Sequence, residues 1–211
     1  MAHGDDKGLR LPPVLAPIQV VMVPIYKNDT EKAPVLDTVA RIKKELIAVG
    51  VRVHVDHRDS VSPGFKYNDW EMRGVPVRME IGPKDVEKNN AVLARRDIPG
   101  KEGKQFVSQD GLAQRVKDLL TDVQANMLKQ ATEFRDANIH DVTSYDQMRQ
   151  VVEAGNWARA GWAGSGDDEA RIKEETGATI RCFPFDQPSD KGKCIMTGND
   201  AQQVALFARA Y

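Results

Sequence analysis

Hydrophobic residues follow three different spacings over the first 56 residues of the chain. Residues 18–24 form a short apolar run, which is typical of a buried strand. Over residues 34–49 apolar side chains return every three or four positions and Gly50 follows, which predicts an amphipathic helix. Over residues 51–56 apolar and polar residues alternate, which predicts a second strand. Strand, helix and strand in this order indicate a parallel pair with a right-handed crossover.

Polar residues follow the carboxyl end of this second strand. Ligands of parallel sheets bind beyond the carboxyl ends of the strands. The candidate ligand-binding residues at this place are His57, Arg58, Asp59 and Ser62.

The stretch over residues 62–85 reads SPGFKYNDWEMRGVPVRMEIGPKD and predicts three elements. Ser62 is a typical helix N-cap followed by proline, and Gly74 is a typical residue at a helix C-terminus. Residues 75–81 alternate apolar and other side chains, which predicts a strand with one apolar face and one face that carries charge. A Gly-Pro turn and a short helix from residue 84 follow.

Three charged residues of this stretch, Glu71, Arg78 and Lys84, are expected to converge near one end of a sheet. A carboxylate can accept two hydrogen bonds from the N1–H and N2–H edge of guanine, and a guanidinium can donate two to its O6 and N7 atoms. The set would suit a reader of unpaired guanines. From spacing alone, solvated surface charges without a ligand are the simpler interpretation, because most charged residues are exposed.

Later segments complete the first unit and predict a second. Strands are expected over 91–95 and 104–108, and a long helix with an apolar stripe over 112–137. The pattern breaks over residues 138–143, where a second unit begins. Its predicted elements are helices over 145–154 and 167–176 and strands over 157–163, 178–185 and 203–211.

Composition narrows the functional classes. With 41% hydrophobic residues and 30 basic against 31 acidic residues, the chain is typical of a packed globular protein, and any nucleic-acid contact needs a local patch. Cys182 and Cys194 form no disulfide framework, which favours a reducing cytoplasm. We expect no membrane span and no signal peptide. Nucleophile-elbow, P-loop and dinucleotide motifs are absent, so no catalytic residue is predicted in this chain.

Four segments, in this order, resemble the C-terminal half of prolyl-tRNA synthetase, of the type shared by archaea, eukaryotic cytoplasm and some bacteria. They read HGDDKGLRLPPVLAPIQVVMVPI, DHRDSVSPGFKYNDWEMRGVPVRMEIGPKD, RIKEETGATIRCFPFD and VALFARAY, and the resemblance covers essentially the whole chain. It implies that residues 1–17 are the tail of a class II catalytic domain. Residues 18–137 would be an α/β anticodon-binding domain with a mixed five-stranded sheet flanked by helices, and residues 138–211 a small α+β C-terminal domain.

The resemblance also implies a function. The parent enzyme would be a cytoplasmic homodimer that activates proline with ATP and magnesium and charges tRNA(Pro), while this chain alone lacks the catalytic core and is expected to be inactive. Proline anticodons end in two guanines. By motif position their readers are Glu71, Arg78 and Lys84, with Lys66 as a candidate for the RNA backbone. The carboxylate of the terminal Tyr211 is implied to approach the catalytic domain.

One departure from the family concerns zinc. The family's C-terminal domain often carries four cysteine ligands, and the corresponding positions here are Ala163, Asp168, Cys194 and Thr197. Since a structural zinc site needs about four ligands, we expect no zinc. The candidates for an apolar substitute are Trp162, Ile172, Ile195 and Met196.

Two other functions stay open at this point. The first is a free-standing α/β interaction module that binds a protein or a regulatory ligand through the same sheet. The second is a small α/β hydrolase, which the absence of a nucleophile motif disfavours.

Overall fold

The computed structural model describes residues 3–210, and the chain forms two compact units that meet in sequence between Gln130 and Ala131. The division falls within the long helix α4 (Leu112–Ala137). Each unit has its own hydrophobic core.

The first unit is built on a mixed five-stranded sheet with the strand order β4-β3-β5-β6-β7. β3 pairs in parallel with β4 and β5, whereas the β5–β6 and β6–β7 pairs are antiparallel. The strands are β3 (Val20–Pro24), β4 (Val53–Val55), β5 (Val77–Ile81), β6 (Asn90–Arg95) and β7 (Lys104–Ser108). The predicted mixed α/β fold is therefore confirmed for this unit.

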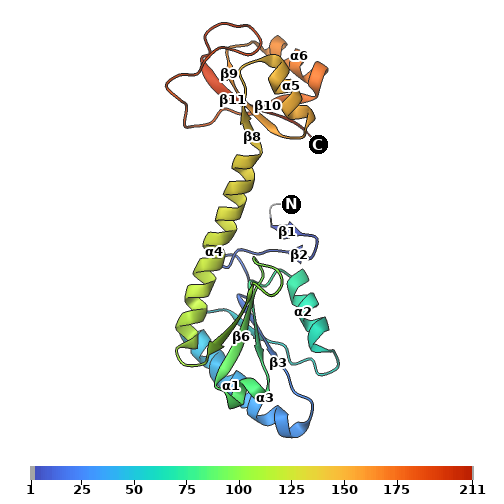
Figure 1. The fold of residues 1–211 in the computed structure, drawn as a ribbon, viewed down its shortest axis with the longest axis vertical. Coiled ribbons are helices and arrows are strands. Elements are labelled where there is room, and N and C mark those ends of the chain that lie inside the picture. The colour runs from blue at the N-terminus through green and yellow to red at the C-terminus, as the bar shows by residue number, and fades with distance from the viewer. Residues whose placement is uncertain (1–2, 211) are drawn as a thin grey trace. The chain divides into compact units, whose positions relative to one another are not determined.

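Helices cover both faces of this sheet (Figure 1). On one face α1 (Asp29–Ala48) and α4 pack with Val20 and Met22 of β3 in the main core. On the other face α2 (Pro63–Met72) packs its Trp70 against Val21 and Val23. A short helix, α3 (Pro83–Glu87), follows β5.

The start of α1 differs from the sequence-based expectation. The pattern predicted a helix from residue 34, but α1 begins at Asp29. The reason is the side chain of Asn28, which accepts a hydrogen bond from the backbone N–H of Glu31 at 3.0 Å and caps the helix. Pro34 is accommodated within the helix.

β5 has the predicted alternation, but its charged face is not solvated. Every residue of the strand is buried, and Arg78 and Glu80 are each only 8% exposed. These two side chains alternate with Val77, Met79 and Ile81 of the main core, so they lie on the side of the sheet that α2 covers.

A two-stranded hairpin precedes the sheet, within the residues that the resemblance assigned to the tail of a catalytic domain. It consists of β1 (Gly4–Asp5) and β2 (Gly8–Leu9), paired antiparallel. It lies very close to the C-terminal end of α2: Gly8 has φ +119°, and a Cβ atom there would come within 2.5 Å of the Cα atom of Met72. This approach therefore requires glycine.

The second unit contains a four-stranded sheet of order β10-β11-β9-β8, in which only β8 and β9 are parallel. Met148, Ile172 and Phe207 are fully buried in its core. The elements are β8 (Ile139–Asp141), α5 (Tyr145–Glu153), β9 (Trp157–Trp162), α6 (Gly166–Thr176), β10 (Ala178–Cys182) and β11 (Gln203–Arg209). β8 lies where the sequence indicated a break between units, and Tyr211 lies outside the described residues.

Candidate nucleic-acid interface

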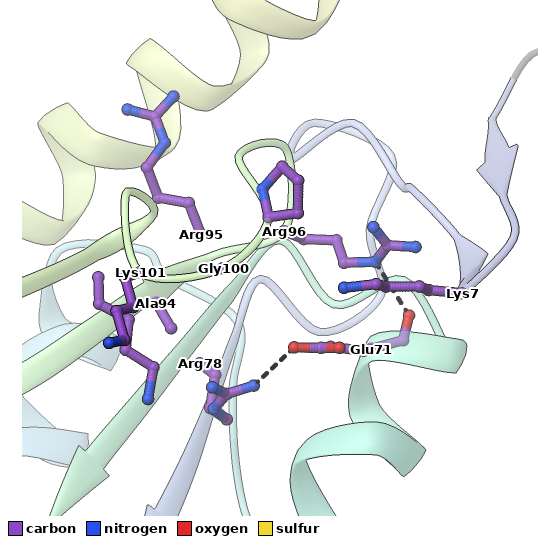
Figure 2. Close-up of a pocket in the computed structure, with 10 residues that line it drawn as sticks. Lys7, Glu71, Arg78, Ala94, Arg95, Arg96, Gly100 and Lys101 are labelled. Atoms are coloured by element: carbon purple, nitrogen blue, oxygen red, sulfur yellow. Dashed lines mark hydrogen bonds and ion pairs between the residues drawn. The ribbon is translucent and has the colours of Figure 1, made fainter.

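A cavity of about 280 Å³ lies on the first unit beside Glu71 and Arg78 (Figure 2). Of the residues that line it six are cationic, and Glu71 is the only carboxylate among them. The lining residues are Lys7, Glu71, Arg78, Ala94, Arg95, Arg96, Pro99, Gly100, Lys101 and Lys104. A chain with a net charge of −1 therefore has a locally basic pocket, as a nucleic-acid contact requires.

The structure brings Glu71 and Arg78 together. Nη1 of Arg78 donates to Oε1 of Glu71 at 3.1 Å, and Nε donates to Oε1 of Glu80 at 3.1 Å. The guanidinium also stacks on the ring of Tyr67, 4.0 Å from its centroid. Arg78 is thus held in one orientation by two carboxylates and an aromatic ring, which is the kind of preorganisation that planar, bidentate recognition needs.

The two members of this pair differ in accessibility. The side chain of Arg78 is 9% exposed, whereas that of Glu71 is 35% exposed at the C-terminal end of α2. Within residues 3–210, Oε2 of Glu71 accepts no hydrogen bond, so this oxygen can take a donor from a ligand. The helix that carries Glu71 starts as expected: Oγ of Ser62 accepts from the N–H of Phe65 at 3.3 Å.

Glu80 is a residue of this site that the sequence analysis did not single out. It is buried, and it also lies 3.3 Å from the ammonium group of Lys104. Burial raises the pKa of Tyr67 well above its ordinary value, and the negative charge of the nearby Glu80 raises it further. Glu80 follows Arg78 by two residues on the same strand, and residues i and i+2 share one face of a sheet. This spacing was the signal in the sequence that could have identified Glu80.

Lys84 and Lys66 do not join this cluster. Lys84 is exposed in the first turn of α3, beyond the carboxyl end of β5, whereas Glu71 precedes the amino end of that strand. Lys66 is buried, and its ammonium group donates to the backbone oxygen of Asp56 at 3.2 Å. That hydrogen bond ties α2 to the segment after β4. An RNA phosphate could bind the ammonium group of Lys66 only if this hydrogen bond broke.

The polar residues after β4 stabilise the fold. Arg58 donates to Asp56 at 2.9 and 2.7 Å and lies 2.8 Å from Asp69, while Asp59 accepts from Lys32 at 2.8 Å. Burial would raise the pKa of Asp56, but hydrogen bonds from Arg58 and Trp70 outweigh it and hold that pKa well below its usual range. The basic pocket lies instead by the amino end of β5, where Val77 pairs with Arg95.

The four positions that correspond to zinc ligands do not fit a zinc ion. Cys194 is buried, Ala163 has no donor atom, and the carboxylate of Asp168 caps α6 by accepting from the N–H of Ser165 at 2.8 Å. Thr197 supplies a hydroxyl in place of a thiolate. Among residues 3–210, no cluster of three or more His, Cys, Asp or Glu side chains is arranged to hold a metal.

Hydrogen bonds and apolar packing surround Cys194 in this corner. Burial acts to raise the pKa of the Cys194 thiol, but hydrogen bonds from Thr197 and from the backbone of Ala163 and Met196 outweigh it and lower that pKa. Cys194 shares a core with Trp162, Ile172 and Ile195, against which Met196 is partly buried. The expected apolar side chains therefore meet here.

Models of known protein families match parts of both units. A family model described as an anticodon binding domain matches residues 19–119, so the first unit contains an anticodon-binding domain. A second model, described as the C-terminal part of prolyl-tRNA synthetase, matches residues 145–211. The chain belongs to the prolyl-tRNA synthetase family.

Three relatives illustrate the similarity, and each aligns over 100% of this chain. A chloroplastic/mitochondrial proline–tRNA ligase of Arabidopsis thaliana is 52% identical, a proline–tRNA ligase of Roseiflexus castenholzii 52% and one of Cenarchaeum symbiosum 46%. The chain spans 39%, 44% and 43% of their respective lengths. Within the part of the chain that the structure describes, no helix is both long and apolar enough to cross a bilayer.

Proposed function

We propose that the pocket beside Glu71 and Arg78 binds the anticodon of tRNA(Pro) and reads its two guanines. The observation that carries this proposal is the 3.1 Å pair of a carboxylate and a guanidinium in a basic cavity of an anticodon-binding domain. The cavity, at about 280 Å³, is slightly smaller than typical ligand pockets, which suits a single base better than a folded RNA element.

The two side chains supply opposite halves of guanine recognition. The free oxygen of Glu71 accepts from the N1–H and N2–H edge, which adenine lacks. Arg78 has five N–H donors, and its remaining ones can reach the O6 and N7 atoms of a guanine. Because Glu80 and Tyr67 already fix the guanidinium, binding a base costs little further side-chain entropy.

Lys84 is the third proposed reader, acting on a neighbouring part of the anticodon loop from the far end of β5. Arg78 and Ile81 are three residues apart on this strand, which corresponds to about 10 Å. This separation supports a contact of the exposed Lys84 with a second nucleotide rather than with the base held by Glu71. We do not extend the proposal to Lys66, whose ammonium group is buried on Asp56.

The chemistry of the parent enzyme lies outside this chain in the proposal. A catalytic domain of the same enzyme would activate proline with ATP and magnesium and esterify the 3′ end of tRNA(Pro), with residues 1–17 as its tail. We further propose that this parent is a cytoplasmic homodimer and that zinc is absent from the C-terminal domain. The relatives' own name, proline–tRNA ligase, supports the reaction.

A binding titration tests the anticodon role. Wild-type chain should bind tRNA(Pro) more tightly than the same tRNA with both anticodon guanines replaced by adenine. Glu71→Gln and Arg78→Ala should each weaken tRNA(Pro) binding by about 1–3 kcal/mol and reduce the discrimination between the two tRNAs, which is the scale of one bidentate base contact. Circular dichroism should confirm that both variants are folded.

The matched control is Arg115→Ala, which removes an exposed guanidinium from α4 on the opposite face of the sheet. It should leave the discrimination unchanged. Equal affinity of wild type, Glu71→Gln and Arg78→Ala would reject the assigned roles. If none of the proteins bound either tRNA, the alternative of an α/β module for a protein or regulatory ligand would be favoured.

A further inference from the structure

One side chain of the basic pocket comes from far outside the sheet. Lys7 lies in the turn between β1 and β2, and it lines the cavity together with Glu71 and Arg78. Figure 2 shows its side chain extending from the hairpin alongside Glu71 and Arg96. The residue is exposed, and within residues 3–210 its ammonium group makes no hydrogen bond or ion pair. It is therefore available to a ligand.

The position of Lys7 is fixed by a buried arginine. Nη1 and Nη2 of Arg96 donate to the two carboxylate oxygens of Asp5 at 2.8 and 2.6 Å. The same carboxylate accepts the backbone N–H of Lys7 at 2.9 Å, which closes the turn. Nε of Arg96 donates to the backbone oxygen of Glu71 at 3.1 Å. One guanidinium thus ties the hairpin to the residue proposed to read guanine.

The close packing of the hairpin supports the same conclusion. A Cβ atom on Gly74 would come within 2.6 Å of the side chain of Leu9, and the N–H of Leu11 donates to the oxygen of Gly74 at 3.2 Å. The hairpin is therefore seated on the end of α2, and Lys7 has a defined place at the pocket.

We propose that the β1–β2 hairpin forms part of the RNA site, beside α2 and the sheet. In this proposal Lys7 binds a phosphate of the anticodon loop, and Asp5 and Arg96 are positioning residues. This inference rests on the proposed function of the pocket. An ammonium group is a point charge with three donors and no acceptor, so it suits a phosphate and carries no base specificity. Lys7 should therefore add affinity without discrimination.

The first test compares Lys7→Ala with Lys117→Ala, which removes the same charge from an exposed position of α4 on the opposite face of the sheet. Lys7→Ala should weaken binding of tRNA(Pro) and of the adenine-substituted tRNA by the same factor, about two- to fivefold. The slope of log Kd against log salt should fall by about 0.7–1, as expected for one lost phosphate contact. Lys117→Ala should change neither quantity.

The second test addresses the positioning role of Asp5. Asp5→Asn should also weaken the binding of both tRNAs. In a chain that already carries Lys7→Ala, adding Asp5→Asn should not weaken binding further, because Asp5 acts through Lys7. Additive effects in this double-mutant cycle would contradict the positioning role. The readout separates positioning from a general loss of stability, which would weaken binding in either background.

The outcomes of the two proposals can be told apart. If Lys7→Ala matches Lys117→Ala while Glu71→Gln still loses discrimination, the proposed role of the hairpin is refuted and the anticodon pocket stands. If Lys7→Ala shifts the salt slope but Glu71→Gln and Arg78→Ala keep full discrimination, the basic surface binds RNA and the guanine assignment is refuted.

Discussion

Replacing Glu80 with glutamine tests whether the interior carboxylate holds Arg78 in place. Glu80→Gln keeps the size of the side chain and removes its charge. In the structure Oε1 of Glu80 accepts a hydrogen bond from Nε of Arg78 at 3.1 Å. The same oxygen lies 3.0 Å from Nη2 of Arg78 and 3.3 Å from the ammonium group of Lys104. Arg78, with only 9% of its side chain exposed, would keep Glu71 as its only carboxylate partner.

The expected cost follows from these contacts. Removing a partner from a buried ion pair costs about 3–5 kcal/mol when the remaining charge is left uncompensated. Here Glu71 still compensates Arg78, and the amide oxygen of glutamine still accepts one hydrogen bond, so we expect a loss of about 1.5–3 kcal/mol, the scale of a hydrogen bond to a charged group. Lys104→Ala removes the more exposed partner of the same carboxylate and should cost only about 0–1 kcal/mol.

Urea unfolding at pH 7 measures both variants, with the free energy extrapolated to water. Spectrophotometric titration of the tyrosines gives a second readout. The pKa of Tyr67 should fall in Glu80→Gln because the charge of Glu80 raises it, yet it should stay above its ordinary value because burial is the larger cause. A stability loss below about 0.5 kcal/mol together with an unchanged titration would refute the buried arrangement.

Two further predictions concern Asp5 and zinc. Hydrogen bonding to Arg96 is the main cause that lowers the pKa of Asp5 from 3.8 to about 2 in the folded chain. Wild type should therefore be more stable than Asp5→Asn above pH 4, and this difference should fade as the pH drops to about 2, as followed by thermal unfolding; a pH-independent difference would contradict it. Elemental analysis of the purified chain should find less than about 0.1 equivalent of zinc, and a chelator should not shift its Tm, since Cys194 lacks the thiolate partners of a structural site.

The sequence carried enough information for the layout of the first unit. Apolar alternation located β5, and the serine–proline pair with Gly74 bounded the helix that carries Glu71. These signals are local: a cap, a turn glycine and a period of two or 3.6 act within a few residues. For the same reason the parallel pairing of β3 with β4 followed from the order strand, helix, strand, whereas the mixed five-stranded sheet was implied by the resemblance to the family.

The environment of the site could not be derived in this way. Alternation shows which residues share a face with Arg78, but it does not show that α2 covers this face and buries Glu80. Lys66 was a candidate for the RNA backbone because nothing local in the sequence indicates its bond to Asp56. The role of Arg96 was also hidden, since its partner Asp5 lies 91 residues away in the sequence.

The long reach of Arg96 also sets an order of events during biosynthesis. Residues 3–9 leave the ribosome well before Arg96, the group that anchors them, has been added 91 positions after Asp5. The hairpin cannot reach its final contacts until β5 and β6 have paired and positioned Arg96. Closing so large a loop also carries an entropic cost. The earliest part of this unit to be made is therefore among the last to take its final place.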